Sequence, residues 1–424
     1  MDIATVRHSD LARAVVTITV GTAAAQLINA VSTPFVARLY GPELLGRFGV
    51  YTALLAILSV FTSLRYDLAI VSASTVTDAA RLVALAVFVL IPASIASGAA
   101  MFLLIRWHLG GLDTLPAYAP LLITGTLILI GLYTISRYWL LREGAFRLVS
   151  LAQFGQALGR TVAQLLIGVT WGGWGGLPVG DSVGRSCGLA RMLGRTYQEV
   201  SGHARPVSVR TLRDVARRYW KFPTYSLPSS LLDTIALWLP TPLLLHFFGA
   251  EATGFYTLAS NLMAVPLLFV GNAIGDVFFS RVSLYAREVP HRVKPFFLRT
   301  TLVLLAAGTP AIALIVVAAG KGLPLLLGRE WAGIGPIPVA LGVGALAQLV
   351  VSPVSRIVVV IQAQEMKLVY DVSSLVMVLV SIKLGDDLSF SLFGTLLLLS
   401  ASQAVAYFIY WMILVKQVGR WTSS

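Results

Sequence analysis

Apolar residues fall in long runs along the whole chain, and charged residues cluster between the runs. A helix of about 20 apolar residues crosses a hydrocarbon layer of ~30 Å. The runs show no alternation with a period of two, which disfavours a membrane β-barrel. The pattern therefore predicts an all-α polytopic membrane protein with about 12 transmembrane helices. The predicted spans are 14–37, 45–64, 82–105, 117–136, 148–170, 174–193, 226–247, 254–280, 297–320, 332–355, 368–382 and 390–415.

The two halves of the chain share a motif at an offset of 208 residues. It pairs Pro34 with Pro242, Gly41 with Gly249, Glu43 with Glu251, and Gly46 with Gly254. Six predicted spans separate the copies, so the repeats run parallel, as in several transporter folds. The repeat predicts two parallel six-helix bundles, at 1–193 and 226–424, related by an axis along the membrane normal.

Residues 194–225 are predicted to be a basic cytoplasmic linker between the bundles. Arg210, Arg213, Arg217 and Lys221 share one helical face in this segment. That arrangement is typical of an interfacial amphipathic helix. An ordinary basic loop is the alternative.

The charge balance sets the orientation. Of 424 residues, 57% are hydrophobic and 12% charged, and the formal net charge is +13. A basic balance can indicate nucleic-acid binding, but in membrane proteins Lys and Arg accumulate in cytoplasmic loops. With the N-terminus in the cytoplasm, 25 of the 32 Lys and Arg residues fall on that side and 6 on the other. We expect a multi-pass protein of the inner (plasma) membrane with both termini cytoplasmic, and no nucleic-acid partner.

Polar side chains recur at helical spacing inside several predicted spans. In the fifth span Arg160 lies about 12 residues, or ~18 Å, from the start, near the bilayer midplane. An ionised group at that depth costs ~2.5–3.5 kcal/mol and usually faces a cavity or a partner. These rows of polar side chains therefore indicate either a path for a polar substrate or hydrogen bonds between helices. We predict a substrate-binding cavity formed by Arg160, Gln26, Asn29, Gln153, Gln156, Gln164, Asn272, Asp276 and Asp233.

The sixth span carries small residues four positions apart, at Gly172, Gly176, Gly180, Gly184 and Gly188. This spacing is typical of close helix packing. On the neighbouring face, Asp181 and Arg185 lie one turn apart and form either an ion pair or a gate. A structural ion pair between Arg160 and one of the acids Asp181, Asp233 or Asp276 is the alternative to substrate binding by Arg160.

Few residues could support catalysis or metal binding. The only cysteine is Cys187, which excludes disulfides and cysteine metal sites within one chain. The five histidines include no His-x-x-x-His pair. A membrane glycosyltransferase or polymerase would need paired carboxylates or a large outer loop carrying Arg and His, and neither is visible. We therefore expect a protein that is not an enzyme, without catalytic residues, cofactor or metal.

The first predicted hairpin resembles that of polysaccharide-biosynthesis (Wzx-type, O-antigen) flippases. The resemblance rests on Leu27-Ile28-Asn29, Pro34, Ala37-Arg38-Leu39-Tyr40-Gly41-Pro42-Glu43, Gly46 and Leu64-Arg65-Tyr66-Asp67-Leu68-Ala69-Ile70. It is sharp over residues 14–86 and architectural beyond them, and Asp67 stands where the family is expected to carry glutamate. Arg65 and Asp67 are the matched charged positions, and they form either an inner-side gate or a helix-end ion pair.

The resemblance implies the multidrug/oligosaccharidyl-lipid/polysaccharide exporter fold with a central cationic cavity. It also implies a flippase that moves an undecaprenyl-pyrophosphate-linked oligosaccharide from the cytoplasmic to the outer leaflet during surface polysaccharide biosynthesis. The implied partners are the lipid-linked oligosaccharide, membrane lipids and assembly proteins such as a polysaccharide polymerase. The alternatives are a cation-coupled multidrug exporter on the same fold and a non-transporting scaffold of a polysaccharide assembly complex.

Overall fold

The computed structural model describes residues 8–108, 112, 114–203, 208–361 and 363–422, and over these residues the chain is helical and contains no strand. This confirms the predicted all-α class. In chain order the helices are α1 (His8–Ser59), α2 (Tyr66–Ser72), α3 (Val76–Arg106), α4 (Ala119–Arg142), α5 (Phe146–Thr170), α6 (Gly176–Ser186), α7 (Leu189–His203), α8 (Val209–Arg218), α9 (Leu227–Trp238), α10 (Pro240–Pro266), α11 (Asn272–Glu288), α12 (Val293–Leu327), α13 (Ile337–Val351), α14 (Ile357–Val360), α15 (Gln364–Asp387) and α16 (Leu392–Trp421).

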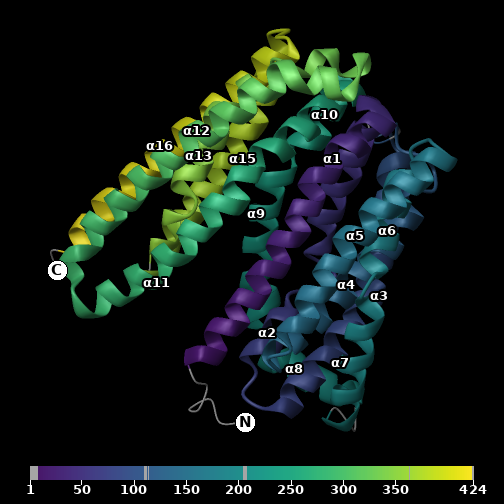
Figure 1. Cartoon of the computed structure of the whole chain (residues 1–424). Coiled ribbons are helices and arrows are strands. Elements are labelled where there is room, and N and C mark those ends of the chain that lie inside the picture. The colour runs from purple at the N-terminus through teal and green to yellow at the C-terminus, as the bar shows by residue number, and fades with distance from the viewer. Residues whose placement is uncertain (1–7, 109–111, 113, 204–207, 362, 423–424) are drawn as a thin grey trace. The chain divides into compact units, whose positions relative to one another are not determined.

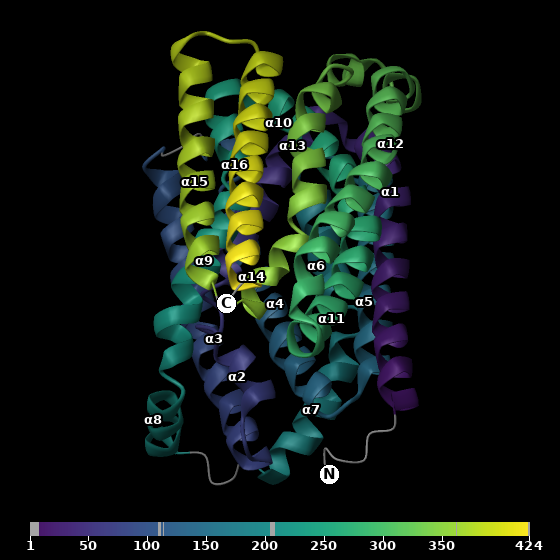
Figure 2. The same ribbon diagram turned by 90° about the vertical axis from the view of Figure 1, so that its left-hand side faces the viewer.

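The helices form two compact units. The first comprises Met1–Tyr40 and Val50–Thr234, and the second comprises Gly41–Gly49 and Ile235–Ser424. In the first unit α3 and α4 lie side by side, and α5 packs along α6 (Figure 1). In the second unit α16 packs between α13 and α15 (Figure 2). The segment boundaries 1–193, 194–225 and 226–424 stay a prediction.

Seven helical segments in the described part of the chain are long and apolar enough to cross a membrane. One of them, Phe222–Glu288, has 67 residues. At 1.5 Å per residue the helices in this segment add up to roughly 100 Å of helix, about three times the ~30 Å hydrocarbon thickness. The segment can therefore hold more than one crossing. The chain is therefore a multi-pass membrane protein, and the count of 12 spans stays a prediction.

The predicted sixth span is divided in the structure. α6 ends at Ser186, Cys187 is extended, and Gly188 has a positive φ of 79° before α7 begins at Leu189. A residue with positive φ cannot continue a right-handed helix, and glycine adopts this conformation without steric cost. The predicted helix over 174–193 is thus two helices joined by a bend.

The two copies of the repeated motif have matching bends. The long helices α1 and α10 change direction at Gly41 (φ 71°) and Gly249 (φ 81°), which the 208-residue offset pairs. Within the second unit the copies pack on each other: an added Cβ on Gly46 would overlap the backbone of Ala250, and one on Gly254 would overlap the Pro42 carbonyl. Equivalent positions thus have equivalent geometry, which supports the repeat.

This close approach predicts that Gly254→Ala destabilises the protein. The new methyl group would meet backbone atoms of the first copy, which cannot move without displacing the bend. Overpacking of this kind costs about 1–3 kcal/mol or more. Gly322→Ala is the matched control, because an added Cβ there would have no atom within 4 Å beyond its own helix turn. Thermal unfolding of the purified variants measures the difference, and equal unfolding temperatures would contradict the packing argument.

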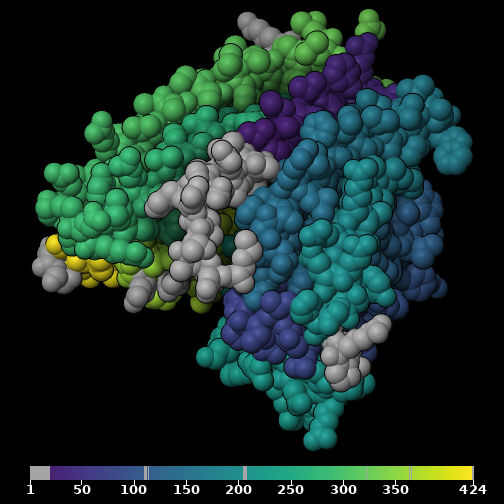
Figure 3. Space-filling view, turned by 60° about the horizontal axis from the view of Figure 1, so that its bottom comes forward, coloured from purple at the N-terminus to yellow at the C-terminus, as the bar shows by residue number. Residues whose placement is uncertain are grey.

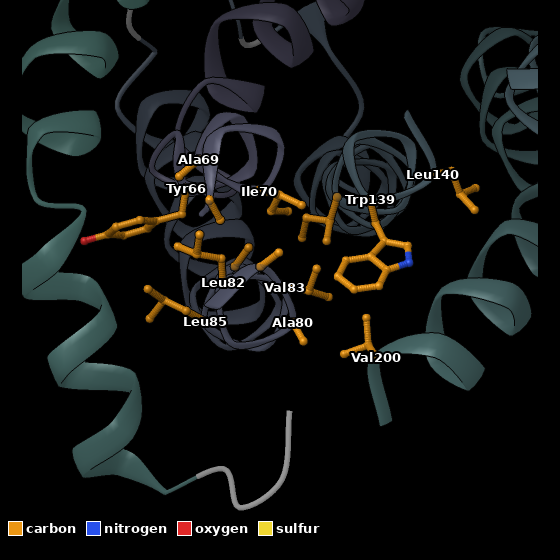
Figure 4. Packing of buried hydrophobic residues seen from close by; sticks show 14 of the residues in the cluster. Tyr66, Ala69, Ile70, Ala80, Leu82, Val83, Leu85, Trp139, Leu140 and Val200 are labelled. Atoms are coloured by element: carbon orange, nitrogen blue, oxygen red, sulfur yellow. The ribbon is translucent and has the colours of Figure 1, made fainter. Parts of the chain in front are cut away.

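One end of the first unit has its own hydrophobic core, in which Tyr66, Ile70, Leu82 and Trp139 are buried together (Figure 4). Helix α8 packs on this core through Leu212 and Val215.

An ion pair of 2.7 Å between Arg218 and Asp78 of α3 also fixes α8. In Figure 3 the teal surface of the 190–220 region adjoins the dark blue surface of residues near 60–80. The predicted amphipathic segment is therefore helical and packed on the first unit. Its basic residues Arg210, Arg213, Arg217 and Lys221 are exposed.

Candidate functional site

The site lies in the first unit, where α5 and α6 are in close contact. Two glycines of α6 allow this approach. An added Cβ on Gly180 would lie 2.8 Å from the Gln164 backbone nitrogen, and one on Gly184 would lie 2.5 Å from the Arg160 backbone nitrogen. The glycine spacing read from the sequence therefore does bring two helices together, and it places Arg160 directly against α6.

A cavity of about 200 Å³ opens between α1, α4, α5 and α6. Most of the polar residues that recur at helical spacing in the first and fifth predicted spans, now in α1 and α5, lie together there. The lining residues are Thr22, Ala25, Gln26, Asn29, Tyr133, Gln153, Gln156, Ala157, Arg160, Asp181 and Arg185. Periodicity had indicated that the α1 and α5 stripes are polar, and the structure shows that they face one common space.

Three charged groups dominate this cavity. The Asp181 carboxylate is almost fully buried, with 1% of the residue exposed. Its Oδ2 accepts a 2.7 Å bond from Arg185 Nε, and its Oδ1 lies 3.7 Å from Arg160 Nη1. The Arg160 guanidinium also donates to the side-chain oxygen of Asn29. Because one carboxylate lies between two guanidinium groups, the charged groups of the cavity have a net positive charge.

Two amide side chains of α5 form hydrogen bonds with the neighbouring helices α1 and α6. Thr22 of α1 donates to the Gln153 side-chain oxygen at 3.0 Å, and Gln156 donates to the Arg185 carbonyl at 3.1 Å. About a third of the Arg160 side chain (34%) remains exposed. The guanidinium is thus oriented by fixed neighbours while part of it still faces open space, an arrangement that can present N–H groups to an anion.

Four residues of the predicted cavity are not among those lining it. Gln164 is buried and donates to the Leu177 carbonyl of α6 at 3.0 Å, so it links α5 to α6. Asp233 is exposed on α9. Asn272 and Asp276 belong to α11 in the second unit.

Asp276 forms an ion pair with Arg356. Sequence periodicity missed this partner, because Arg356 falls just after a predicted span. Tyr133 of α4, which lines the cavity of the first unit, was missed as well, because it belongs to no polar stripe at helical spacing.

The structure does not join Arg65 and Asp67 in an ion pair within the described residues. Asp67 is buried and accepts a 2.6 Å hydrogen bond from Ser63. Arg65 has a left-handed conformation (φ 66°) at the start of α2. The Asp67 carboxylate is thus bonded to the Ser63 hydroxyl and not to Arg65. In contrast, Asp181 and Arg185 do form the ion pair described above.

Metal-ligand clusters are absent from the described residues: no group of three or more His, Cys, Asp or Glu side chains could hold an ion there. Besides the Asp181 carboxylate and the hydroxyls of Thr22 and Tyr133, the polar groups of the cavity are amides and guanidinium groups, which bind anions and hydroxyls.

The fold is shared with membrane transporters. A multidrug resistance MATE family transporter of the MOP superfamily matches with a TM-score of 0.73 and 14% identity, over 94% of this chain and 96% of that one. The lipid II flippase MurJ matches with a TM-score of 0.72 and 11% identity, over 96% and 90%. At such identities the likeness concerns the fold alone. The fold resembles that of these two transporters, as expected.

Sequence comparison identifies the family. Residues 35–336 match the profile of a family described as "Polysaccharide biosynthesis protein". No individual curated protein matches the sequence. Because the profile covers most of the chain, the chain belongs to this polysaccharide biosynthesis family, which confirms the resemblance seen in the first hairpin. The chain thus combines membership of the polysaccharide biosynthesis family with a fold that it shares with a MATE transporter and with the MurJ flippase.

Proposed function

We propose that this protein is a flippase that moves an undecaprenyl-pyrophosphate-linked oligosaccharide from the cytoplasmic to the outer leaflet of the inner membrane. The observation that carries the proposal is the cavity around Arg160 in a chain of the polysaccharide biosynthesis family. The substrate offers two polar parts for recognition: a doubly charged pyrophosphate linkage and a glycan rich in hydroxyl groups. The cavity offers two guanidinium groups and several amides.

Charge favours this substrate over a cationic drug. A guanidinium donates two parallel hydrogen bonds to phosphate and keeps its charge at any physiological pH. A cation would need a surplus of carboxylates, whereas Asp181 already neutralises Arg185 at 2.7 Å. The multidrug exporter is therefore the weaker candidate, although the same fold serves such transporters.

A deletion strain tests the proposal directly. We expect loss of the surface polysaccharide, accumulation of its lipid-linked precursor in the inner membrane, and rescue of both by the plasmid-borne gene. Sensitivity to cationic dyes should stay unchanged. Increased dye sensitivity with a normal surface polysaccharide would instead support the drug exporter. Because the flipped product would be consumed by assembly proteins such as a polymerase, deletion of the polymerase should shorten the glycan chains without trapping the precursor on the inner leaflet.

The charge bias predicts the topology, which cysteine labelling tests. In a Cys187→Ser background, Glu251→Cys should react with a membrane-impermeant maleimide in intact cells. Residue 251 lies between the seventh and eighth predicted spans, which is the outer side when the N-terminus is cytoplasmic. Gly202→Cys, in the basic segment, should react only after the membrane is opened. Both positions are exposed, so access to the reagent decides the result. Labelling of Gly202→Cys from outside intact cells would reject the orientation.

A further inference from the structure

A second polar site lies in the second unit, between the start of α12 and the end of α16. The two helix ends border an open groove of about 780 Å³. Its lining residues are Lys294, Trp411, Met412, Val415, Lys416, Gly419 and Arg420. This groove is separate from the Arg160 cavity, whose lining residues all belong to the first unit.

The groove combines three cations with no lining acid among the residues that the structure describes there. Lys294 comes from α12, and Lys416 and Arg420 lie one turn apart on α16. Gly419 makes room for the first of them, because an added Cβ there would lie 3.2 Å from the Lys294 Nζ. Positive charge from two helices therefore converges on one hollow, and an anion can neutralise it.

The other wall of the groove is apolar. Trp411, Met412 and Val415 line it on the side toward the middle of α16. The Trp411 indole N–H points to the Thr301 hydroxyl of α12 at 3.4 Å, which fixes the ring. Tryptophan is enriched where a membrane protein meets the headgroup layer. A ligand that fills this groove must be anionic at one end and apolar at the other.

We propose that the groove binds an anionic phospholipid, with the headgroup phosphate between Lys294, Lys416 and Arg420 and the first acyl carbons on Trp411. Basic pockets between transmembrane helices near the cytoplasmic surface bind acidic headgroups in this way. A soluble phosphate would use the cations but leave the apolar wall exposed. The site is independent of the transported substrate and concerns lipid bound at the edge of the second unit.

Native mass spectrometry of the purified, delipidated protein tests this site. Phosphatidylglycerol and phosphatidylcholine are each added, and retained lipid is counted. We expect retention of phosphatidylglycerol only. The triple variant Lys294→Gln/Lys416→Gln/Arg420→Gln should bind it roughly a hundredfold more weakly, since each basic residue near an anionic surface contributes about fivefold. Inorganic phosphate at millimolar concentration should not displace the lipid; if it does so completely, the ligand is free phosphate and the lipid assignment is wrong.

The matched control is Arg281→Gln/Arg287→Gln/Arg292→Gln, which removes the same charge from exposed positions of the same unit that do not line the groove. It should retain phosphatidylglycerol like the parent. Equal loss in both triple variants would show that overall charge, not the groove, attracts the lipid, and would overturn the proposal. A variant Lys294→Arg/Lys416→Arg, which keeps the charge, should bind normally. If this variant has the parent's unfolding temperature but does not bind the lipid, the site is rejected as well.

Discussion

Replacement of Arg160 by alanine should abolish transport of the lipid-linked oligosaccharide while the protein still inserts at normal abundance. The guanidinium faces the cavity with a third of its side chain exposed. Asn29 and Asp181 hold it from two sides. Removal of one partner of a buried charge pair typically costs 2–5 kcal/mol, and the pair lost here is that of the guanidinium with the substrate's pyrophosphate. We therefore expect surface polysaccharide to fall by roughly 30-fold or more.

The conservative variant separates charge from geometry. Arg160→Lys keeps the positive charge but offers a point donor in place of the planar fork, so it should retain part of the transport. Arg191→Ala is the charge-matched control, because Arg191 is exposed on α7 and does not line the cavity. Surface polysaccharide and membrane abundance are measured together for every variant. If Arg160→Ala shows normal membrane abundance and normal surface polysaccharide, the hypothesis that Arg160 binds the substrate is wrong.

The rival explanation is a structural ion pair between Arg160 and Asp181. The distances argue against it as the main role, since Asp181 bonds Arg185 at 2.7 Å and lies 3.7 Å from Arg160. Asp181 would keep a partner when Arg160 is lost. If the pair were nevertheless structural, Arg160→Ala would lower abundance, and the double variant with Asp181→Asn would partly restore it. The double variant should instead remain inactive.

Periodicity alone located much of this site. An apolar run interrupted by Gln153, Gln156 and Arg160 at helical spacing can only be a helix with one polar face. The structure places those residues around one cavity with Asn29 of α1. The first hairpin motif likewise indicated the family, because its glycines and proline specify a bend that the fold requires.

Other features depend on contacts between distant residues, which periodicity does not encode. Nothing in the local sequence shows that Asp181 would lie between Arg160 and Arg185, or that Asp276 would pair with Arg356. Gln164 has the spacing of the polar stripe, yet it bonds a backbone carbonyl of α6. A stripe thus indicates which face is polar but not whether each member meets a cavity or a neighbouring helix.

The same contact between α5 and α6 predicts that Gly184→Ala will impair both folding and transport. The added methyl group would lie 2.5 Å from the Arg160 backbone nitrogen and 2.6 Å from its Cα, closer than any real Cβ contact. The backbone of α5 must therefore shift, and Arg160 must move with it. Overpacking of a well-packed core costs about 1–3 kcal/mol.

Gly125→Ala on α4 is the matched control, because an added Cβ there would have no atom within 4 Å beyond its own helix turn. Alanine also favours a helix over glycine by about 1 kcal/mol. We expect a lower unfolding temperature for Gly184→Ala and an equal or higher one for Gly125→Ala. Transport per folded molecule, measured as surface polysaccharide divided by membrane abundance, should also fall in Gly184→Ala alone. A folded Gly184→Ala protein with full transport would mean that α6 does not set the position of Arg160.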